Sequence, residues 1–199
     1  MKKTLIILCL LFSSSVIADD ISDFQIEGMS VGDSLLDYFS EKEINDNSSN
    51  KQKYQFEKFS IMDSSLLKDF NGLQIVFESP LDQNSLIKLK DKSDQYIIHS
   101  ITGAIDFPDK IDECKNKKNE VVSVLTKLFD NPEISNVTEN HKQDKNGKSK
   151  IFGTYFYFDS TSIYSDVLVQ CTDWDKAMGF TDYLRLQIKT QEYSEWISK

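Results

Sequence analysis

The chain has 199 residues and a formal net charge of −9, and Arg185 is the only arginine among its 23 basic residues. This acidic balance argues against nucleic acid and anionic membrane surfaces as partners, because both attract dense positive charge. The shortage of arginine also argues against an enzyme that handles phosphate, since arginine is the usual side chain for gripping that group.

The first eighteen residues have the order of a secretory signal peptide. Lys2 and Lys3 precede a short apolar run at residues 5–12 (LIILCLLF), and mostly small residues follow up to Ala18. This order predicts export, with cleavage between Ala18 and Asp19. The apolar run is shorter than the roughly 20 residues that span a bilayer.

Cys9 offers an alternative, because the cysteine of a bacterial lipoprotein follows a small residue at the end of the apolar run. Here Leu8 precedes Cys9 in the middle of the run, so a cleaved signal peptide is favoured. Cleavage removes two lysines and leaves one domain, residues 19–199, with 181 residues and a net charge of −11. We expect a periplasmic or secreted protein with no membrane span in the mature chain.

The first half of the mature chain indicates short strands separated by polar segments. A short helix is expected after Ser30 or Asp33, because Leu35, Leu36 and Phe39 form an apolar stripe. The polar residues 45–53 (NDNSSNKQK) indicate a loop. Strands are expected over residues 54–61, 73–78, 86–90 and 95–107, the last with Ile97, His99, Ile101, Ile105 and Phe107 on one face.

One long amphipathic helix and a C-terminal meander follow. Apolar residues recur at helical spacing from about Asp109 to Phe129, and Asn131-Pro132 stops the helix. Asn146-Gly147 indicates a hairpin turn, and Thr190 caps a final helix. Strands are expected over residues 151–159, 163–172 and 182–190. We therefore predict an α+β fold: a mostly antiparallel sheet with the long helix packed on it, short N- and C-terminal helices, and helices on one sheet face.

Two cysteines, Cys114 and Cys171, remain after cleavage. Cys114 lies on the apolar stripe of the long helix, and Cys171 lies on the apolar face of a predicted strand. Both side chains should therefore point into one helix–sheet interface, and an oxidising compartment favours a disulfide between them. A catalytic or redox cysteine is the alternative, but neither has a C-x-x-C partner or a local histidine.

The two histidines and a short acidic turn have simple structural interpretations. His99 lies among isoleucines, which favours a core histidine over a catalytic base, and His141 is expected in a solvated loop or strand edge. Residues 144–147 (DKNG) begin like a calcium loop but lack its remaining ligands, so a β-turn is favoured. We expect no metal and no cofactor, since two histidines and two cysteines leave few ligands for zinc.

A secreted hydrolase that uses carboxylates is the alternative function. Asp173 and Asp175 flank Trp174, and Asp182 follows soon after. Paired carboxylates beside an aromatic ring are typical of glycoside hydrolysis, although spacing in the sequence does not set their separation in space. An organised pocket of titratable groups would favour this enzyme.

The C-terminal strands also predict a face rich in tyrosine. If the large apolar residues of these strands meet the long helix, the other face displays Tyr155, Tyr157, Tyr183 and Arg185. The large apolar residues that alternate with them are Phe152, Phe156, Phe158, Leu184, Leu186 and Ile188. Tyrosine and arginine are enriched in recognition surfaces, so this face is a candidate for binding. Alternatively, the N-terminal strands cover it.

Three stretches of the sequence carry a resemblance. Residues 20–44 (DISDFQIEGMSVGDSLLDYFSEKEI), the CTDW at residues 171–174 and the EYSEWI at residues 192–197 resemble small secreted proteins of AT-rich bacteria. That likeness implies no particular activity or site residues. Gly28-Met29-Ser30 followed by a short helix is also similar to the opening of small outer-membrane assembly lipoproteins of the SmpA/OmlA type.

These patterns lead to one preferred function. We expect an exported, non-enzymatic binding or interaction module whose partner is a protein or a small molecule, with the carboxylate hydrolase as the alternative. An open sheet face without converging titratable groups would favour binding.

Overall fold

The computed structural model describes residues 21, 24–48, 59–64, 70–78, 96–129, 131–158 and 167–198. The signal segment, its cleavage site and the expected strand at residues 86–90 lie outside these residues, so they stay predictions. Within the described residues, no helix is both long and apolar enough to cross a membrane.

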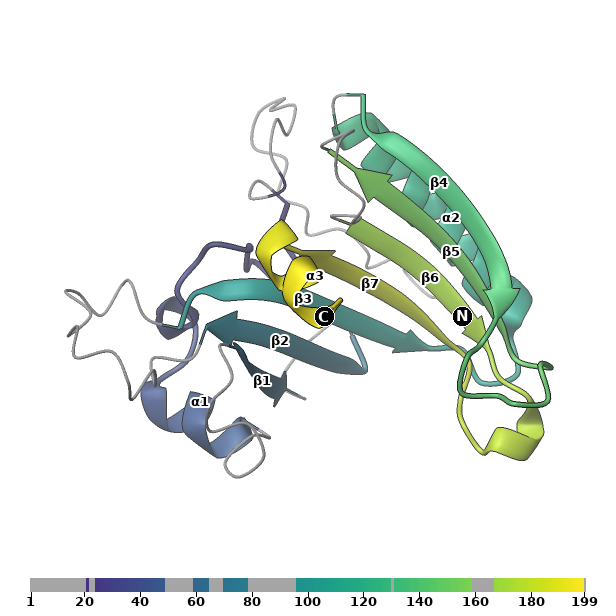
Figure 1. Cartoon of the computed structure of the whole chain (residues 1–199), viewed down its shortest axis with the longest axis horizontal. Coiled ribbons are helices and arrows are strands. Elements are labelled where there is room, and N and C mark those ends of the chain that lie inside the picture. The colour runs from purple at the N-terminus through teal and green to yellow at the C-terminus, as the bar shows by residue number, and fades with distance from the viewer. Residues whose placement is uncertain are drawn as a thin grey trace, which may run out of the picture.

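One antiparallel sheet of seven strands organises the described chain. The strand order across the sheet is β1-β2-β3-β7-β6-β5-β4, so β7 joins the N-terminal and C-terminal halves by pairing with β3 and β6 (Figure 1). The strands are β1 (Phe59–Ser64), β2 (Gly72–Glu78), β3 (Ile98–Asp106), β4 (Glu133–Asn140), β5 (Lys150–Tyr157), β6 (Val167–Asp173) and β7 (Tyr183–Lys189).

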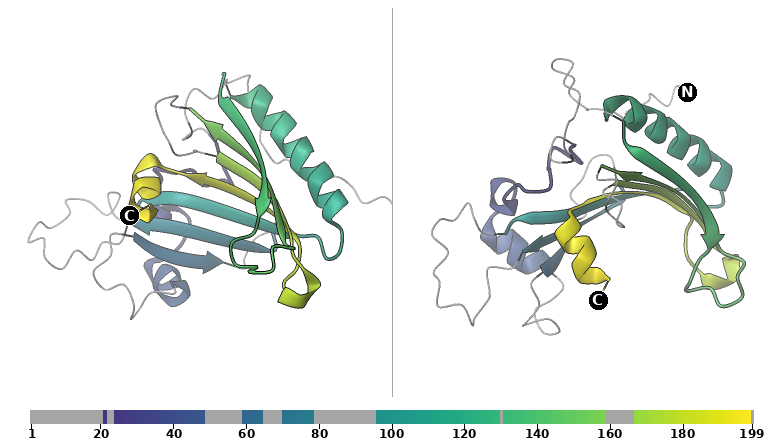
Figure 2. Two further views of the ribbon diagram at one scale, coloured as in Figure 1. Left: turned by 45° about the vertical axis from the view of Figure 1, so that its right-hand side comes forward. Right: turned by 45° about the horizontal axis from the view of Figure 1, so that its top comes forward.

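In the described residues, three α-helices accompany the sheet: α1 (Glu41–Asn47), α2 (Ile111–Leu128) and α3 (Gln191–Ile197). The predicted α+β class and the long helix packed on the sheet are confirmed. Figure 2 shows α2 and α3 on opposite sides of the sheet, so the expectation of helices on one face was wrong. Short 3-10 helices span Leu35–Asp37 and Lys176–Met178.

The face that carries α2 holds the main core. Along β5, β6 and β7, Phe156, Val167 and Ile188 are opposite one another in register and fully buried. The N-terminal segment lies beside α2 on this face, because Phe24 packs edge-on against Phe129 just after the helix, with ring centroids 5.8 Å apart. The large apolar residues of the C-terminal strands thus face α2, as predicted.

Helix α1 replaces the start of the expected polar loop. Ser40 and Glu43 form a capping box in which each side chain bonds the other residue's backbone N–H, and Ile44 is fully buried. Residues 45–47 are therefore helical, and residues 49–58 lie outside the described chain. The polar composition of the segment concealed a helix held by one apolar anchor and its cap.

A β-bulge in β3 changes which residues share a face. The register with β2 shifts between Val76 and Phe77, so Ile98 rather than Ile97 joins Ile101 on the core face. His99 is turned toward the opposite face, where it contacts residues of β1 and α3. Strict alternation along residues 95–107 predicted the wrong neighbours for His99. The bulge shifts the register by one residue, so the side chains before it point to the opposite face from the one expected.

Strand β4 was not expected from the sequence. Its segment EISNVTEN is polar and mostly exposed, and it pairs with β5 from Glu133↔Tyr157 to Asn140↔Lys150 at the edge of the sheet. An edge strand buries little side-chain surface, so it needs no apolar pattern.

Candidate binding face

The structure places all four residues of the predicted tyrosine face on the side of the sheet opposite α2. Arg185 pairs with Ala104 of β3 and Gln170 of β6, and Tyr183 lies two residues earlier on β7. Tyr155 and Tyr157 lie on β5, with Tyr155 opposite Leu168. All four side chains are partly exposed, and the described N-terminal segment packs on the other face of the sheet rather than over them.

The buried Nε nitrogen of Arg185 lacks a hydrogen-bond partner among the described residues. It donates to no acceptor there, and the guanidinium forms no ion pair with the described residues. Neighbouring amides are engaged elsewhere: Gln170 Nε2 donates to Thr172 Oγ1 at 3.0 Å, and Gln187 Nε2 donates to Ser100 Oγ at 3.3 Å. A buried donor without an acceptor is uncommon, because its desolvation is not compensated.

Tyrosines from two elements lie around Arg185. Burial raises the pKa of Tyr155 on β5 and of Tyr193 on α3, and in both cases the positive charge of Arg185 opposes the increase. The guanidinium is thus close enough to act electrostatically on both rings. Tyr193 was not predicted as part of this face, because the expected topology placed the last helix on the other side of the sheet.

Gly153 allows the ring of Tyr155 to lie close to the sheet. A Cβ atom at Gly153 would lie 2.9 Å from Cε2 of Tyr155, too near for any real side chain. The ring therefore covers the backbone beside Gln170, which pairs with both Gly153 and Arg185. A ring held in this way offers contact area at little cost in conformational entropy.

A shallow groove of about 540 Å³ begins at Arg185 and Tyr183 and extends across the sheet toward β1. Its lining residues come from β1, β2, β3, β7 and the residue before β2: Asp63, Ser64, Asn71, Gly72, Leu73, Gln74, Thr102, Ala104, Tyr183 and Arg185. Sequence reasoning found only the β7 residues of this groove. The others are ordinary strand residues, and only the strand order brings them together.

His99 lies under α3 at the end of the same face. It is buried, packs edge-on against Phe59 with ring centroids 4.8 Å apart, and its Nδ1 lies 3.0 Å from Thr190 Oγ1. Its ring nitrogens lie 3.7 Å from carboxylate oxygens of Glu78 and Glu192. These contacts agree with a core histidine that fixes α3 on the sheet.

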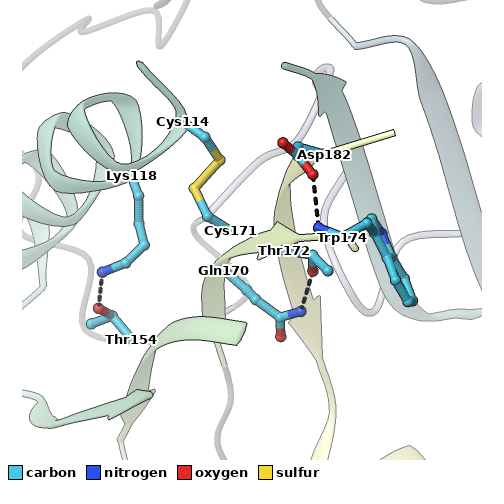
Figure 3. Close-up of a disulfide and its surroundings, with 8 residues drawn as sticks. All are labelled: Cys114, Lys118, Thr154, Gln170, Cys171, Thr172, Trp174 and Asp182. Atoms are coloured by element: carbon cyan, nitrogen blue, oxygen red, sulfur yellow. Dashed lines mark hydrogen bonds between the residues drawn. A yellow bond between two sulfur atoms is a disulfide. The ribbon is translucent and has the colours of Figure 1, made fainter. Parts of the chain in front are cut away.

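The disulfide joins helix α2 to strand β6 and lies on the α2 side of the sheet (Figure 3). Cys114 of α2 and Cys171 of β6 are bonded, with their Cα atoms 6.1 Å apart, as predicted. One turn along α2, the buried Lys118 donates to Thr154 Oγ1 at 2.7 Å, and Thr154 in turn donates to Asn136 Oδ1 at 2.7 Å. The burial of Lys118 lowers the pKa of its amine.

The carboxylates of the alternative hydrolase site are engaged in local structure. Asp182 Oδ1 accepts a hydrogen bond from the backbone N–H of Trp174 at 2.7 Å, and Asp175 caps the 3-10 helix through Ala177 N. Burial and the nearby charge of Asp182 raise the pKa of Asp173. These residues lie outside the groove, so the structure does not bring them to it.

His141 and the turn at residues 144–147 lie near Trp174 and the aspartates that flank it. His141 directly follows the edge strand β4 and is half-buried, because its ring packs at a tilt against the ring of Trp174 with centroids 4.1 Å apart. Asp144 accepts hydrogen bonds from the backbone N–H groups of Asn146, Lys148 and Ser149, and from the Ser149 hydroxyl. These bonds, with that of Ser149 N the largest contributor, lower the pKa of Asp144 to about 2. The carboxylate therefore organises the turn itself.

Within the described part of the chain, no group of three or more histidine, cysteine or acidic side chains is arranged to hold a metal ion. Comparisons with protein-family models, with curated proteins and with solved structures find no match. The argument for function therefore rests on the geometry of the groove and of the face around Arg185.

Proposed function

We propose that this chain is an exported, non-enzymatic binding module of the periplasm or the surrounding medium, and that Arg185 anchors an anionic group of its ligand. The face formed by Tyr155, Tyr157, Tyr183 and Arg185 provides the contact surface. The order of residues 1–18 and the Cys114–Cys171 disulfide support an oxidising compartment.

One observation carries the proposed binding role: the guanidinium of Arg185 is half-buried between tyrosines, yet its Nε has no acceptor among the described residues. A guanidinium has five N–H donors in a plane, which suit the two oxygens of a carboxylate. In a chain of net charge −9, an unpaired cation of this kind is a specific anchor for a negative group.

Binding is favoured over hydrolysis because the groove and the clustered carboxylates are separate. Asp182 and Asp175 each accept a hydrogen bond from a backbone N–H, which commits them to holding local structure. A hydrolase would need an acid and a second carboxylate converging on the site that holds the substrate.

The test exposes purified protein to a periplasmic extract and identifies retained small molecules by mass spectrometry. Wild type should retain an anionic compound, Arg185→Gln should lose it, and Tyr157→Ser should retain less. Lys127→Gln is the matched control, because Lys127 is exposed in the last turn of α2, outside the groove. Equal retention by wild type and Arg185→Gln, or no anion retained by wild type, would contradict the proposal.

A further inference from the structure

The groove has a floor of small residues that can be traced through the sheet register. Arg185 on β7 is opposite Ala104 on β3, and Ala104 is opposite Gly72 on β2. All three point to the same face because residues directly opposite in a ladder share a side. A Cβ atom added at Gly72 would meet nothing within 4 Å, so there is open space directly above this residue.

Polar side chains form one long wall of the groove. Asp63, Gln74 and Thr102 are opposite one another on β1, β2 and β3, one step along the strands from the floor. They offer a carboxylate, an amide and a hydroxyl, which can both donate and accept hydrogen bonds. A main chain lying on the glycine and alanine floor would have its N–H and C=O groups within reach of this wall.

The two ends of the groove carry opposite charges. Arg185 marks the β7 end, and Asp63 marks the β1 end, where it is exposed and accepts one hydrogen bond from Gln74 Nε2 at 3.2 Å. Neighbouring strands lie about 4.8 Å apart, so three steps separate the backbones of β7 and β1 by about 14 Å. The groove therefore suits a ligand with a carboxylate at one end and an ammonium at the other.

We propose that the groove binds a short peptide with both ends free, its C-terminal carboxylate against Arg185 and its N-terminal ammonium against Asp63. An extended chain advances about 3.3 Å per residue, so three or four residues match the length of the groove. This inference rests on the proposed function, since it uses the same anchor, Arg185, and adds the chemical class of the ligand.

The probe is an equimolar library of tripeptides and tetrapeptides with free ends, together with two capped copies of it. One copy is acetylated at the N-terminus and the other is amidated at the C-terminus. Peptides retained by the protein after equilibrium dialysis are measured by mass spectrometry. Amidation should reduce retention about tenfold or more, because it removes a charge-assisted bond to Arg185. Acetylation should reduce it about threefold, because Asp63 is exposed to solvent.

Three variants test which residue contacts each end of the peptide and whether the peptide lies on the floor of the groove. Arg185→Gln should bind amidated and free-acid peptides equally, while Asp63→Asn should bind acetylated and free-amine peptides equally and keep its preference for a free carboxylate. Gly72→Val should block all peptides, because its side chain would fill the open floor without a steric clash. Lys127→Gln should behave as wild type.

Two results would overturn the inference while leaving the proposed function standing. The first is retention that depends on the C-terminal carboxylate but not on the N-terminal ammonium, which would assign a monoanionic ligand. The second is no peptide retained by wild type when the periplasmic extract still yields an Arg185-dependent anion. Failure of both experiments would remove the anchor itself, and with it the proposed function.

Discussion

The amine of Lys118 lies in the helix–sheet interface, where its hydrogen-bond partner is the hydroxyl of Thr154. Its Nζ donates to Thr154 Oγ1, and no ion pair with a described carboxylate accompanies it. Burial of a charged group costs free energy unless the group is paired, which is why desolvation lowers the pKa of this lysine. The folded protein therefore pays to keep Lys118 charged near neutral pH.

Replacing Lys118 with a methionine should stabilise the fold. We expect Lys118→Met to raise the free energy of unfolding at pH 7 by about 1 kcal/mol, as other buried charges do when replaced by apolar residues. A lowered pKa means that the unfolded state binds more protons above the folded pKa, so the stability of wild type rises with pH. The advantage of the variant should therefore shrink in urea unfolding as the pH is raised toward 10.5, the ordinary pKa of lysine. Lys127→Met is the exposed control, and a less stable Lys118→Met protein at pH 7 would contradict the argument.

Asp144 stabilises the fold, in contrast to Lys118, and this stabilisation is lost at low pH. Its pKa of about 2, held down by the N–H groups of its own turn, lies below the ordinary value of 3.8. The stability that it adds is complete above about pH 4, the unfolded pKa, and is lost as the pH falls toward 2. Asp144→Asn should lower the urea midpoint at pH 7, and the difference from wild type should narrow below pH 4. Asp37 is an exposed aspartate, so Asp37→Asn should change the urea midpoint little at either pH. If the difference in midpoint between wild type and Asp144→Asn stays the same at both pH values, the proposed link between the Asp144 pKa and stability is wrong.

At the scale of elements, Phe70 packs against a gap in β3 that only glycine provides. A Cβ atom at Gly103 would lie 2.5 Å from two atoms of the Phe70 ring, on the core face of the sheet. We expect Gly103→Ala to destabilise the protein by about 1–3 kcal/mol through overpacking, measured by thermal unfolding. Gly72→Ala, where nothing lies within 4 Å, should be close to neutral, and Phe70→Leu should partly rescue Gly103→Ala. Equal effects at the two glycines would contradict the close contact.

The elements that the sequence predicted well share long or clear patterns. The residues of α2, β2 and the three C-terminal strands show clear apolar periodicity, and Asn131-Pro132 stops α2, so local rules were sufficient. The capping box at Ser40 and Glu43 was a readable signal for α1 that the polar composition obscured. The polar edge strand β4 and the β3 bulge had no local signal, because pairing with a neighbour decides both.

One part of the candidate site could be predicted from local patterns and another part could not. Alternation alone placed Tyr155, Tyr157, Tyr183 and Arg185 on one face, and it did not require knowledge of the strand order. The groove did require it, because Asp63 is far from Arg185 in sequence and lies in the same groove only because β7 pairs with β3. The placement of α3 on that face likewise depends on the bulge that turns His99 toward Thr190.

At the scale of the whole molecule, the Cys114–Cys171 bond closes a loop across 57 residues and joins α2 to the centre of the sheet. In the chain-entropy account such a loop contributes about 4 kcal/mol by restricting the unfolded chain. Replacing both cysteines with alanine should lower the free energy of unfolding by an amount of that order. Peptide retention by the folded variant should match wild type, because the disulfide and Arg185 lie on opposite faces. Unchanged thermal stability would contradict the first expectation.

Export and the disulfide make one joint prediction. The chain made with residues 1–18 should be recovered outside the cytoplasm with Asp19 as its first residue and without a thiol that alkylates before reduction, since cleavage also removes Cys9. A chain that starts at residue 19 and stays in the reducing cytoplasm should instead show two free thiols, at Cys114 and Cys171. It should unfold at the temperature of the double alanine variant until it is oxidised. N-terminal sequencing and alkylation before and after reduction measure both parts. Exported protein that keeps residues 1–18 would refute the cleavage site, and exported protein with two free thiols would refute the oxidised state.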